Sequence, residues 1–127
     1  MSAPLRLPAR QLEKLQNAKM VRVRSGSEHR YTSVWAVIVK GRVFVRSWND
    51  KPTGWYRAFR DEPRGSIAVD ETEIAVRAVP VRSERLRHAV STAYGEKYTT
   101  KANQKWVRGF AAAKREAATL ELIPAGQ

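Results

Sequence analysis

The fold of this chain is decided by residues 33–48, which read Ser33-Val34-Trp35-Ala36-Val37-Ile38-Val39-Lys40-Gly41-Arg42-Val43-Phe44-Val45-Arg46-Ser47-Trp48. The six residues after Ser33 are all apolar, which predicts a strand covered on both faces. One cover would be the core, and the other a helix or a second subunit. Lys40-Gly41 fits a tight hairpin turn. We therefore expect residues 43–48 to return as an antiparallel strand beside residues 33–39.

Four further strands are expected on either side of this hairpin. Residues 20–24 alternate apolar and basic side chains, the pattern of a half-exposed strand. Residues 65–69 and 73–81 are joined by a turn at Asp70-Glu71, and residues 118–123 alternate until Pro124. A small sheet with short hairpins tends to close on itself, because closure removes its exposed edges. We predict an α+β fold built on a small antiparallel β-barrel of about six strands.

Three or four helices are expected around this barrel. Residues 7–15 have Pro8 at a first helical position and belong to a covering segment at residues 1–18. Residues 55–60 have helical spacing and end before Pro63. Ser83 suits the N-cap of a helix that Gly95 ends, and residues 103–114 form another helix. With no repeat or linker in the sequence, we predict a single domain over residues 1–127.

The charge of the chain favours anionic partners. Lys and Arg number 24 against 12 for Asp and Glu, a formal net charge of +12. Such an excess suits phosphate groups, nucleic acid or acidic headgroups, although a basic and soluble surface also explains it. The absence of cysteine excludes disulfides and thiolate chemistry, and we expect no metal site. No run of about 18 apolar residues and no signal-like N-terminus is present, so we expect a cytoplasmic protein without a membrane span.

Three arginines are candidates for an anion site. Arg22 and Arg24 alternate on one predicted strand, and Arg46 belongs to another. If all three guanidinium groups point inward together, they require an anion, because a buried cationic cluster is otherwise too costly. If Arg46 faces outward, all three are solvated surface. The sequence leaves both readings open.

Aromatic residues around a polar loop are candidates for a ligand pocket. Trp48, Trp55 and Tyr56 flank that loop, where large rings often line a pocket, although Trp55 also suits anchoring of its helix to the barrel. Tyr98 suits either a hydroxyl at the pocket mouth or helix packing. His29 and His88 have no partner at the spacing of metal ligands or of a catalytic triad. We therefore name no catalytic side chain, and assign any difficult chemistry to a bound cofactor.

Residues 32–69 resemble the flavin- and deazaflavin-binding split β-barrel superfamily. The resemblance is carried by the turn before Thr32, the apolar strand, Lys40-Gly41-Arg42, residues 43–47 and Trp55-Tyr56-Arg57. Residues 117–124 are similar to the last strand of the same proteins. Within the superfamily the chain looks like the deazaflavin-dependent nitroreductase-like branch. It is most similar to the bacterial domain-of-unknown-function 2255 family.

The resemblance implies a cofactor, its site and an assembly. The ring of flavin mononucleotide (FMN) or of a deazaflavin coenzyme would lie over residues 32–36, which include Thr32 and Trp35. Its phosphate would be held by Ser47, Lys51 and Arg57. With the arginines above, the expected cofactor-binding residues are Arg22, Arg24, Thr32, Trp35, Arg46, Ser47, Lys51, Trp55 and Arg57, and the expected substrate pocket is Trp48, Tyr56 and Tyr98. Several branches of the superfamily are homodimers, and others are monomers.

Three functions are compatible with these features. The first is a flavin- or deazaflavin-dependent oxidoreductase that transfers hydride to a small conjugated or electron-poor substrate. The second is a barrel of the same fold without redox chemistry, which binds another small anion or a protein partner. The loop Asn49-Asp50-Lys51-Pro52-Thr53 favours it, because FMN binders carry a Ser/Thr-Arg-Lys cluster there. The third is a nucleic-acid-binding barrel, which the net charge favours and the spread of arginines over the whole chain disfavours.

Overall fold

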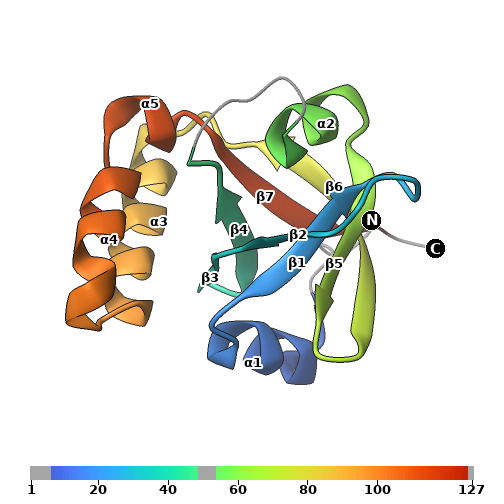
Figure 1. The fold of residues 1–127 in the computed structure, drawn as a ribbon, viewed down its shortest axis with the longest axis horizontal. Helices are drawn as coiled ribbons and strands as arrows, with labels where there is room; N and C mark the ends of the chain where they lie inside the picture. The colour runs from blue at the N-terminus through green and yellow to red at the C-terminus, as the bar shows by residue number, and fades with distance from the viewer. Residues whose placement is uncertain (1–6, 49–53, 126–127) are drawn as a thin grey trace, which may run out of the picture.

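The computed structural model describes residues 7–48 and 54–125, which contain seven strands, five α-helices and one 3₁₀ helix (Figure 1). The strands are β1 (Val21–Ser25), β2 (Thr32–Val34), β3 (Ala36–Val39), β4 (Arg42–Arg46), β5 (Arg64–Val69), β6 (Thr72–Pro80) and β7 (Thr119–Pro124). The helices are α1 (Ala9–Asn17), α2 (Trp55–Asp61), α3 (Glu84–Lys97), α4 (Gln104–Phe110), α5 (Ala113–Glu116) and the 3₁₀ helix η1 (Lys101–Asn103).

The strands form one antiparallel sheet that closes almost completely into a barrel. Their order is β2-β1-β5-β6-β7-β4-β3, with every neighbouring pair antiparallel. The two edge strands, β2 and β3, are separated in sequence by Trp35 alone. The two edges of the sheet therefore have to meet at Trp35. The predicted α+β fold with an antiparallel split barrel is confirmed, and the single strand predicted over residues 33–39 is divided in two at this closure.

The hairpin between β3 and β4 has the predicted turn. Lys40 and Gly41 both have positive φ, 52° and 76°. A type I′ turn requires positive φ at both central residues, and glycine adopts it at little cost. β3 and β4 then pair in register, with Val37 opposite Phe44.

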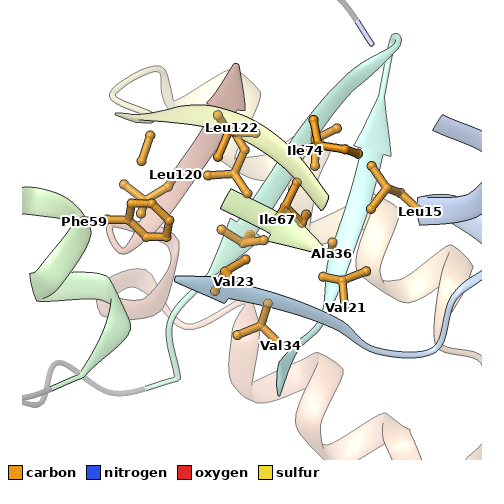
Figure 2. Packing of buried hydrophobic residues seen from close by; sticks show 14 of the residues in the cluster. Leu15, Val21, Val23, Val34, Ala36, Phe59, Ile67, Ile74, Leu120 and Leu122 are labelled. Carbon is orange, nitrogen blue, oxygen red and sulfur yellow. The ribbon is translucent and has the colours of Figure 1, made fainter. Parts of the chain in front are cut away.

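Apolar side chains fill the interior of the barrel (Figure 2). Val21 and Val23 of β1 point inward, while Arg22 between them is exposed. Leu15 of α1 and Phe59 of α2 enter the same interior from outside the sheet, and both are almost fully buried. Each Leu or Phe side chain buried in this way contributes about 1.5–3 kcal/mol of hydrophobic stabilisation.

A second apolar cluster lies between the outer face of the barrel and the helices. Val37 of β3 and Phe44 of β4 pack there against Val90 and Tyr94 of α3 and Phe110 of α4. In Figure 1 the helices α3, α4 and α5 gather on this one side of the barrel. The outer cover expected for residues 33–39 is thus supplied by α3, and the homodimer stays a prediction.

The helical segments differ from the sequence prediction at two places. α3 begins as predicted, because Ser83 Oγ accepts a hydrogen bond from the Leu86 amide at 3.2 Å. It does not end at Gly95 but continues to Lys97, and Gly95 lies where α4 packs closely against α3. The helix predicted over residues 103–114 is divided into η1, α4 and α5. None of the described helices is long and apolar enough to cross a membrane.

Candidate functional site

All four tryptophans of the chain line one pocket of about 340 Å³, which we call the tryptophan pocket. Trp35 joins β2 to β3, Trp48 follows β4, Trp55 begins α2, and Trp106 lies on α4. The volume lies within the range of about 300–1,000 Å³ that is usual for small-molecule sites. The other lining residues are Met20, Ser33, Val34, Arg46, Asn103 and Phe110.

Trp35 is fixed from behind by two tyrosines. Its ring stacks on Tyr98 with the centroids 3.9 Å apart and the planes within 5°. Tyr94 donates its hydroxyl to the Trp35 carbonyl at 2.7 Å, and Tyr98 donates its hydroxyl to the Lys19 carbonyl at 2.8 Å. Burial raises the pKa of both phenols, so both stay protonated donors near neutral pH. These contacts hold Trp35 as a rigid wall.

Trp48 is held by contacts from α4 and α5. The guanidinium carbon of Arg115 lies 3.6 Å from the Trp48 ring centroid, and Arg115 Nε donates to the Trp48 carbonyl at 2.8 Å. Trp106 meets the Trp48 ring edge-on at 5.0 Å. A Cβ atom at Gly109 would lie only 2.3 Å from Trp48 Cη2, so the absent side chain of Gly109 is what allows this packing. α4 therefore determines where the Trp48 wall stands.

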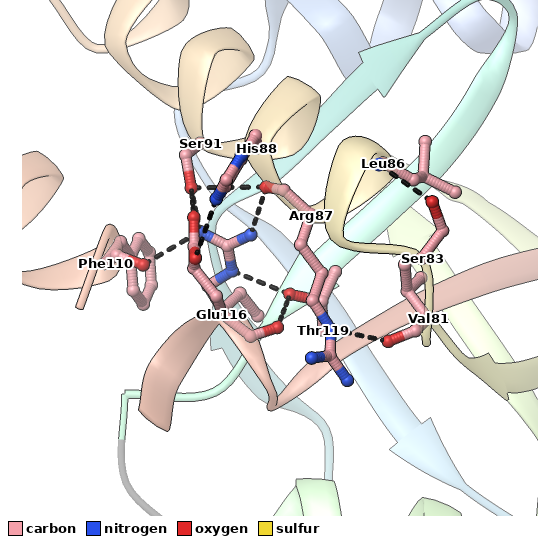
Figure 3. Close-up of polar contacts among 10 residues, drawn as sticks. Val81, Ser83, Leu86, Arg87, His88, Ser91, Phe110, Glu116 and Thr119 are labelled. Carbon is pink, nitrogen blue, oxygen red and sulfur yellow. Dashed lines mark hydrogen bonds and ion pairs between the residues drawn. The ribbon is translucent and has the colours of Figure 1, made fainter. Parts of the chain in front are cut away.

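Arg46 borders the tryptophan pocket, but its hydrogen bonds are made within the protein. Its Nε donates to Thr119 Oγ1 at 2.7 Å, and its Nη1 donates to Ser91 Oγ and to the Phe110 carbonyl. Nη2 donates to the Arg87 carbonyl at 2.9 Å. Figure 3 shows Ser91, Phe110 and Thr119 converging from α3, α4 and β7. Burial lowers the pKa of Arg46, and the guanidinium cross-links three elements around the pocket.

Of the two arrangements that the sequence left open for the three arginines, convergence at one anion site does not occur. Arg22 is exposed and donates to the Asp70 carbonyl at 2.8 Å, far along the barrel from the Arg46 network. The reason is the strand order, in which β1 lies between β2 and β5 while β4 lies between β7 and β3. In addition, Val21 and Val23 point into the barrel, so Arg22 and Arg24 must face outward.

Arg24 instead borders a second, smaller hollow of about 150 Å³, the arginine hollow. Its Nε is buried and is the one buried side-chain polar atom in the described residues that has no hydrogen-bond partner. Arg30, His29 and Thr32 line the same hollow. Trp55 lines both the hollow and the tryptophan pocket, so the two sites share one wall. The remaining lining residues are Ser25, Gly54 and Ala58.

The other predicted site residues lie elsewhere. Ser47 is buried, with its amide donating to the Ala118 carbonyl, and lines neither pocket. Arg57 is on the exposed side of α2, and Lys51 lies outside the described residues. The prediction that Tyr56 lines the substrate pocket is wrong, because α2 turns Tyr56 together with Phe59 into the barrel core. Tyr98 lies behind Trp35.

Sequence reasoning missed several residues that line these sites. Trp106 lies within the helix predicted over residues 103–114 and was not among the expected site residues. Met20, Asn103 and Phe110 are brought to the pocket by the arrangement of α4 against the barrel, for which the sequence carries no signal. Arg30 and His29 lie in a segment that we interpreted only as a turn.

Lys97 occupies the far side of Trp35. Its Nζ donates to the Leu15 carbonyl at 2.9 Å and to the Ala36 carbonyl at 2.6 Å, so it links α1, β3 and α3. Burial lowers the pKa of this ammonium group to about 8. It borders a further hollow of about 460 Å³, which also includes Trp35, Met20 and Asn103.

The side chains gathered here are suited to binding. Indole faces stack on a planar ring, and Ser33 and Asn103 carry hydrogen-bond donors and acceptors for its edge. The arginine hollow offers cations to a negative group. Among the described residues there is no group of three or more His, Cys, Asp or Glu side chains arranged to hold a metal ion.

The sequence and fold were compared with those of known proteins. The family model described as "Uncharacterized protein conserved in bacteria (DUF2255)" matches residues 11–122. No curated protein matches the sequence.

Several solved structures share the fold at low sequence identity. The heme storage protein HutZ from Vibrio cholerae has a TM-score of 0.69 at 15% identity, over 97% of this chain and 93% of that one. A putative pyridoxamine 5'-phosphate oxidase from Listeria innocua has a TM-score of 0.63 at 9% sequence identity, over 92% of each chain. A FAD-binding protein from Mesorhizobium loti has a TM-score of 0.57 at 14% sequence identity, over 94% of this chain and 91% of that one. These likenesses confirm the split-barrel fold.

Proposed function

Since the chain belongs to the DUF2255 family, we propose, from its own pockets, that it is a cofactor-dependent oxidoreductase that binds a phosphorylated flavin or deazaflavin. The observation that carries the proposal is that all four tryptophans line one pocket. Four large rings at one site are more than the barrel core needs, because that core is already filled by aliphatic residues, Tyr56 and Phe59. A planar ligand in this pocket would have indole faces on which to stack.

The residues present fit such a cofactor in two respects. The tryptophan pocket offers aromatic walls and two small polar side chains, the usual composition of a site for a flat heterocycle. Arg24 and Arg30 line the arginine hollow beyond Trp55. Arg24 Nη1 donates to the Ser27 carbonyl at 3.2 Å and its Nη2 lies 3.8 Å from Glu73 Oε1, while its Nε is buried without a hydrogen-bond partner. A buried donor without a partner costs about 1–3 kcal/mol, which a phosphate in the hollow would relieve.

The names of similar structures support the proposal as analogies. A FAD-binding protein and a putative pyridoxamine 5'-phosphate oxidase share this fold. HutZ is a heme storage protein on the same fold, so heme is the competing planar ligand to test. Each of these proteins is 15% identical or less to this chain, so the ligand has to be argued from the pocket itself.

In the proposed reaction the chain binds and orients, and the cofactor supplies hydride transfer when bound. Trp35 and Trp48, both held rigidly, would hold the ring by stacking contacts. Trp106 stands 43% exposed at the mouth of the pocket, where it limits water access beside the ring. Arg24 and Arg30 hold the anionic end. Arg46 acts at a distance, by fixing the three elements that carry the walls.

Quenching of tryptophan fluorescence tests the binding step directly, because every tryptophan of the chain is in the proposed site. We expect FMN or the deazaflavin coenzyme to quench most of the emission saturably, and riboflavin, which lacks the phosphate, to bind about ten-fold more weakly. Arg24→Gln with Arg30→Gln should remove the preference for FMN over riboflavin. Arg60→Gln, on the exposed side of α2, is the matched control and should leave it unchanged.

The outcomes separate the three ligand classes. Failure of every flavin and deazaflavin to quench refutes the proposal, and saturable quenching by hemin alone replaces it with heme binding. If a cofactor binds, its reduced form is mixed with a conjugated or nitro-substituted acceptor, and reoxidation under anaerobic conditions is measured. Binding without any reoxidation supports the non-redox barrel, the second function that the sequence allows.

A further inference from the structure

The helical segment that carries Trp106 has a charge distribution unlike the rest of the chain. Residues 97–115 contain six Lys and Arg residues and no Asp or Glu. Over the whole chain the ratio of basic to acidic residues is 24 to 12. Lys97 ends α3, and the other five lie in η1, α4 and α5, outside the barrel on the side seen at the left of Figure 1.

Three of these cations form a row on η1 and α4. Lys101 lies on η1, and Lys105 and Arg108 lie on α4; all three are exposed. Lys105 and Arg108 are three residues apart, which places them on one face of α4. Within residues 7–48 and 54–125, no carboxylate forms an ion pair with any of the three. Their charges are therefore available to a partner.

An exposed aromatic ring stands beside this row. Trp106 is 43% exposed and, with Met20, is one of two large hydrophobic residues exposed among those the structure describes. Lys105 Nζ lies 5.0 Å from its ring centroid, and Trp48 supports the ring edge-on. The exposed residues Thr99 and Thr100 and the half-buried Asn103 add hydrogen-bonding groups nearby. The surface thus combines a stacking platform, a row of cations and uncharged polar groups.

We infer that η1 and α4 form a second site, which binds single-stranded nucleic acid, with phosphates on the Lys101, Lys105 and Arg108 row and a base stacked on Trp106. Cations that follow the backbone and aromatic rings that take the bases are the two requirements for binding a single strand. An anionic membrane would use the same cations. It would also need an extended apolar face to insert, and α4 exposes only one large apolar side chain.

The site does not depend on the proposed cofactor. Sequence reasoning disfavoured nucleic acid because arginines are spread over the chain, but two of the three cations in the row are lysines, and η1 continues directly into α4. Trp106 borders the tryptophan pocket, so one ring serves both sites from different positions. A bound cofactor and a bound strand can therefore influence each other.

Fluorescence anisotropy of the full chain with a labelled 12-nucleotide poly-U or poly-dT tests the inference. Neutralising about three phosphates gives a salt slope near −2 for a single strand. In Lys101→Gln/Lys105→Gln/Arg108→Gln the slope of log affinity against log salt should be about 2 smaller in magnitude. Between 50 and 200 mM salt, the wild type should therefore lose about 20-fold more affinity than this variant. Trp106→Ala should weaken binding by about ten-fold and leave the slope unchanged.

The matched control removes the same charge elsewhere. Arg77→Gln/Arg82→Gln/Arg85→Gln changes three exposed arginines, on β6, on the connection after it and on α3, and should leave most of the affinity. If both triple variants lost affinity equally, the loss would come from the lower net charge and not from this site, which would overturn the inference. Equal binding of a duplex, or of vesicles with anionic lipid, would overturn it as well. FMN titration of both triple variants keeps the two functions separate, because failure at this site leaves cofactor binding intact.

Discussion

Gly109→Ala should damage the tryptophan pocket while leaving the fold in place. A Cβ atom at position 109 would lie 2.3 Å from Cη2 and 2.7 Å from Cζ3 of Trp48, where ordinary contacts begin near 3.4 Å. The Trp48 ring must therefore move by about 1 Å, away from contacts with Arg115 and Trp106 that now hold it. Overpacking of this kind costs about 1–3 kcal/mol, and alanine returns about 1 kcal/mol because it favours a helix.

The net loss of stability is then about 0–2 kcal/mol, which urea unfolding measures. The displaced wall should cost more in binding. Losing an aromatic stacking contact of about 0.5–1.5 kcal/mol weakens a planar ligand up to about ten-fold. Fluorescence quenching by FMN or the deazaflavin coenzyme measures that loss.

Gly95→Ala provides the matched control. This glycine also lies inside a helix, but its Cβ would meet Val107 Cγ1 at 3.7 Å, an ordinary contact. We expect a gain of about 1 kcal/mol in stability and unchanged ligand affinity. If Gly109→Ala were as stable as Gly95→Ala and bound the ligand equally well, the reasoning about Trp48 would be refuted.

Three further predictions concern stability. Arg46→Met should lower the free energy of unfolding in urea by about 3–5 kcal/mol, because it leaves the buried acceptors of the guanidinium without a donor. Arg46→Lys should recover only part of this loss, because an ammonium group cannot donate in the several directions of a planar guanidinium. Because the Lys97 pKa is lowered from 10.5 to about 8, the unfolded chain holds this proton more tightly, so the stability of the wild type should rise relative to Lys97→Met between pH 8 and 10.5. Solvent screening of this half-buried group limits that rise in stability to about 1–2 kcal/mol. A stability difference between the two proteins that stays constant from pH 8 to 10.5 would contradict the prediction. Ser83→Ala should lower the stability by about 1 kcal/mol because it removes the N-cap of α3, whereas Ser83→Asp should keep most of the wild-type stability.

Local patterns were sufficient for most of the secondary structure. The alternation of Val21, Arg22, Val23 and Arg24 predicts β1 and its inward face, because successive side chains of a strand point to opposite sides. Lys40-Gly41 predicts its turn from backbone conformation alone. The break at Trp35 was not predictable in this way, because it occurs where the two edges of the sheet meet, which depends on all seven strands.

The candidate site was predictable only in its residue types. The sequence pointed to tryptophans near the loop before Trp55, and the structure places Trp35, Trp48 and Trp55 around one pocket. The expected clustering of Arg22, Arg24 and Arg46 is not found in the structure. Arg46 finds its acceptors between residues 87 and 119, and no local pattern reveals partners so far along the chain.

What the sequence determined by itself is most of the strands, the tight hairpin turn at Lys40-Gly41, the start of α3 and the positive charge, because each depends on neighbours a few residues apart. What only the tertiary structure decided is which side chains meet. Closure of the sheet at Trp35 and the packing of α4 on the barrel bring the four tryptophans together from residues 35 to 106, and they turn Arg22 and Arg24 away from Arg46. Contacts between distant segments are set by strand order and helix packing, which follow from burying the whole apolar surface at once.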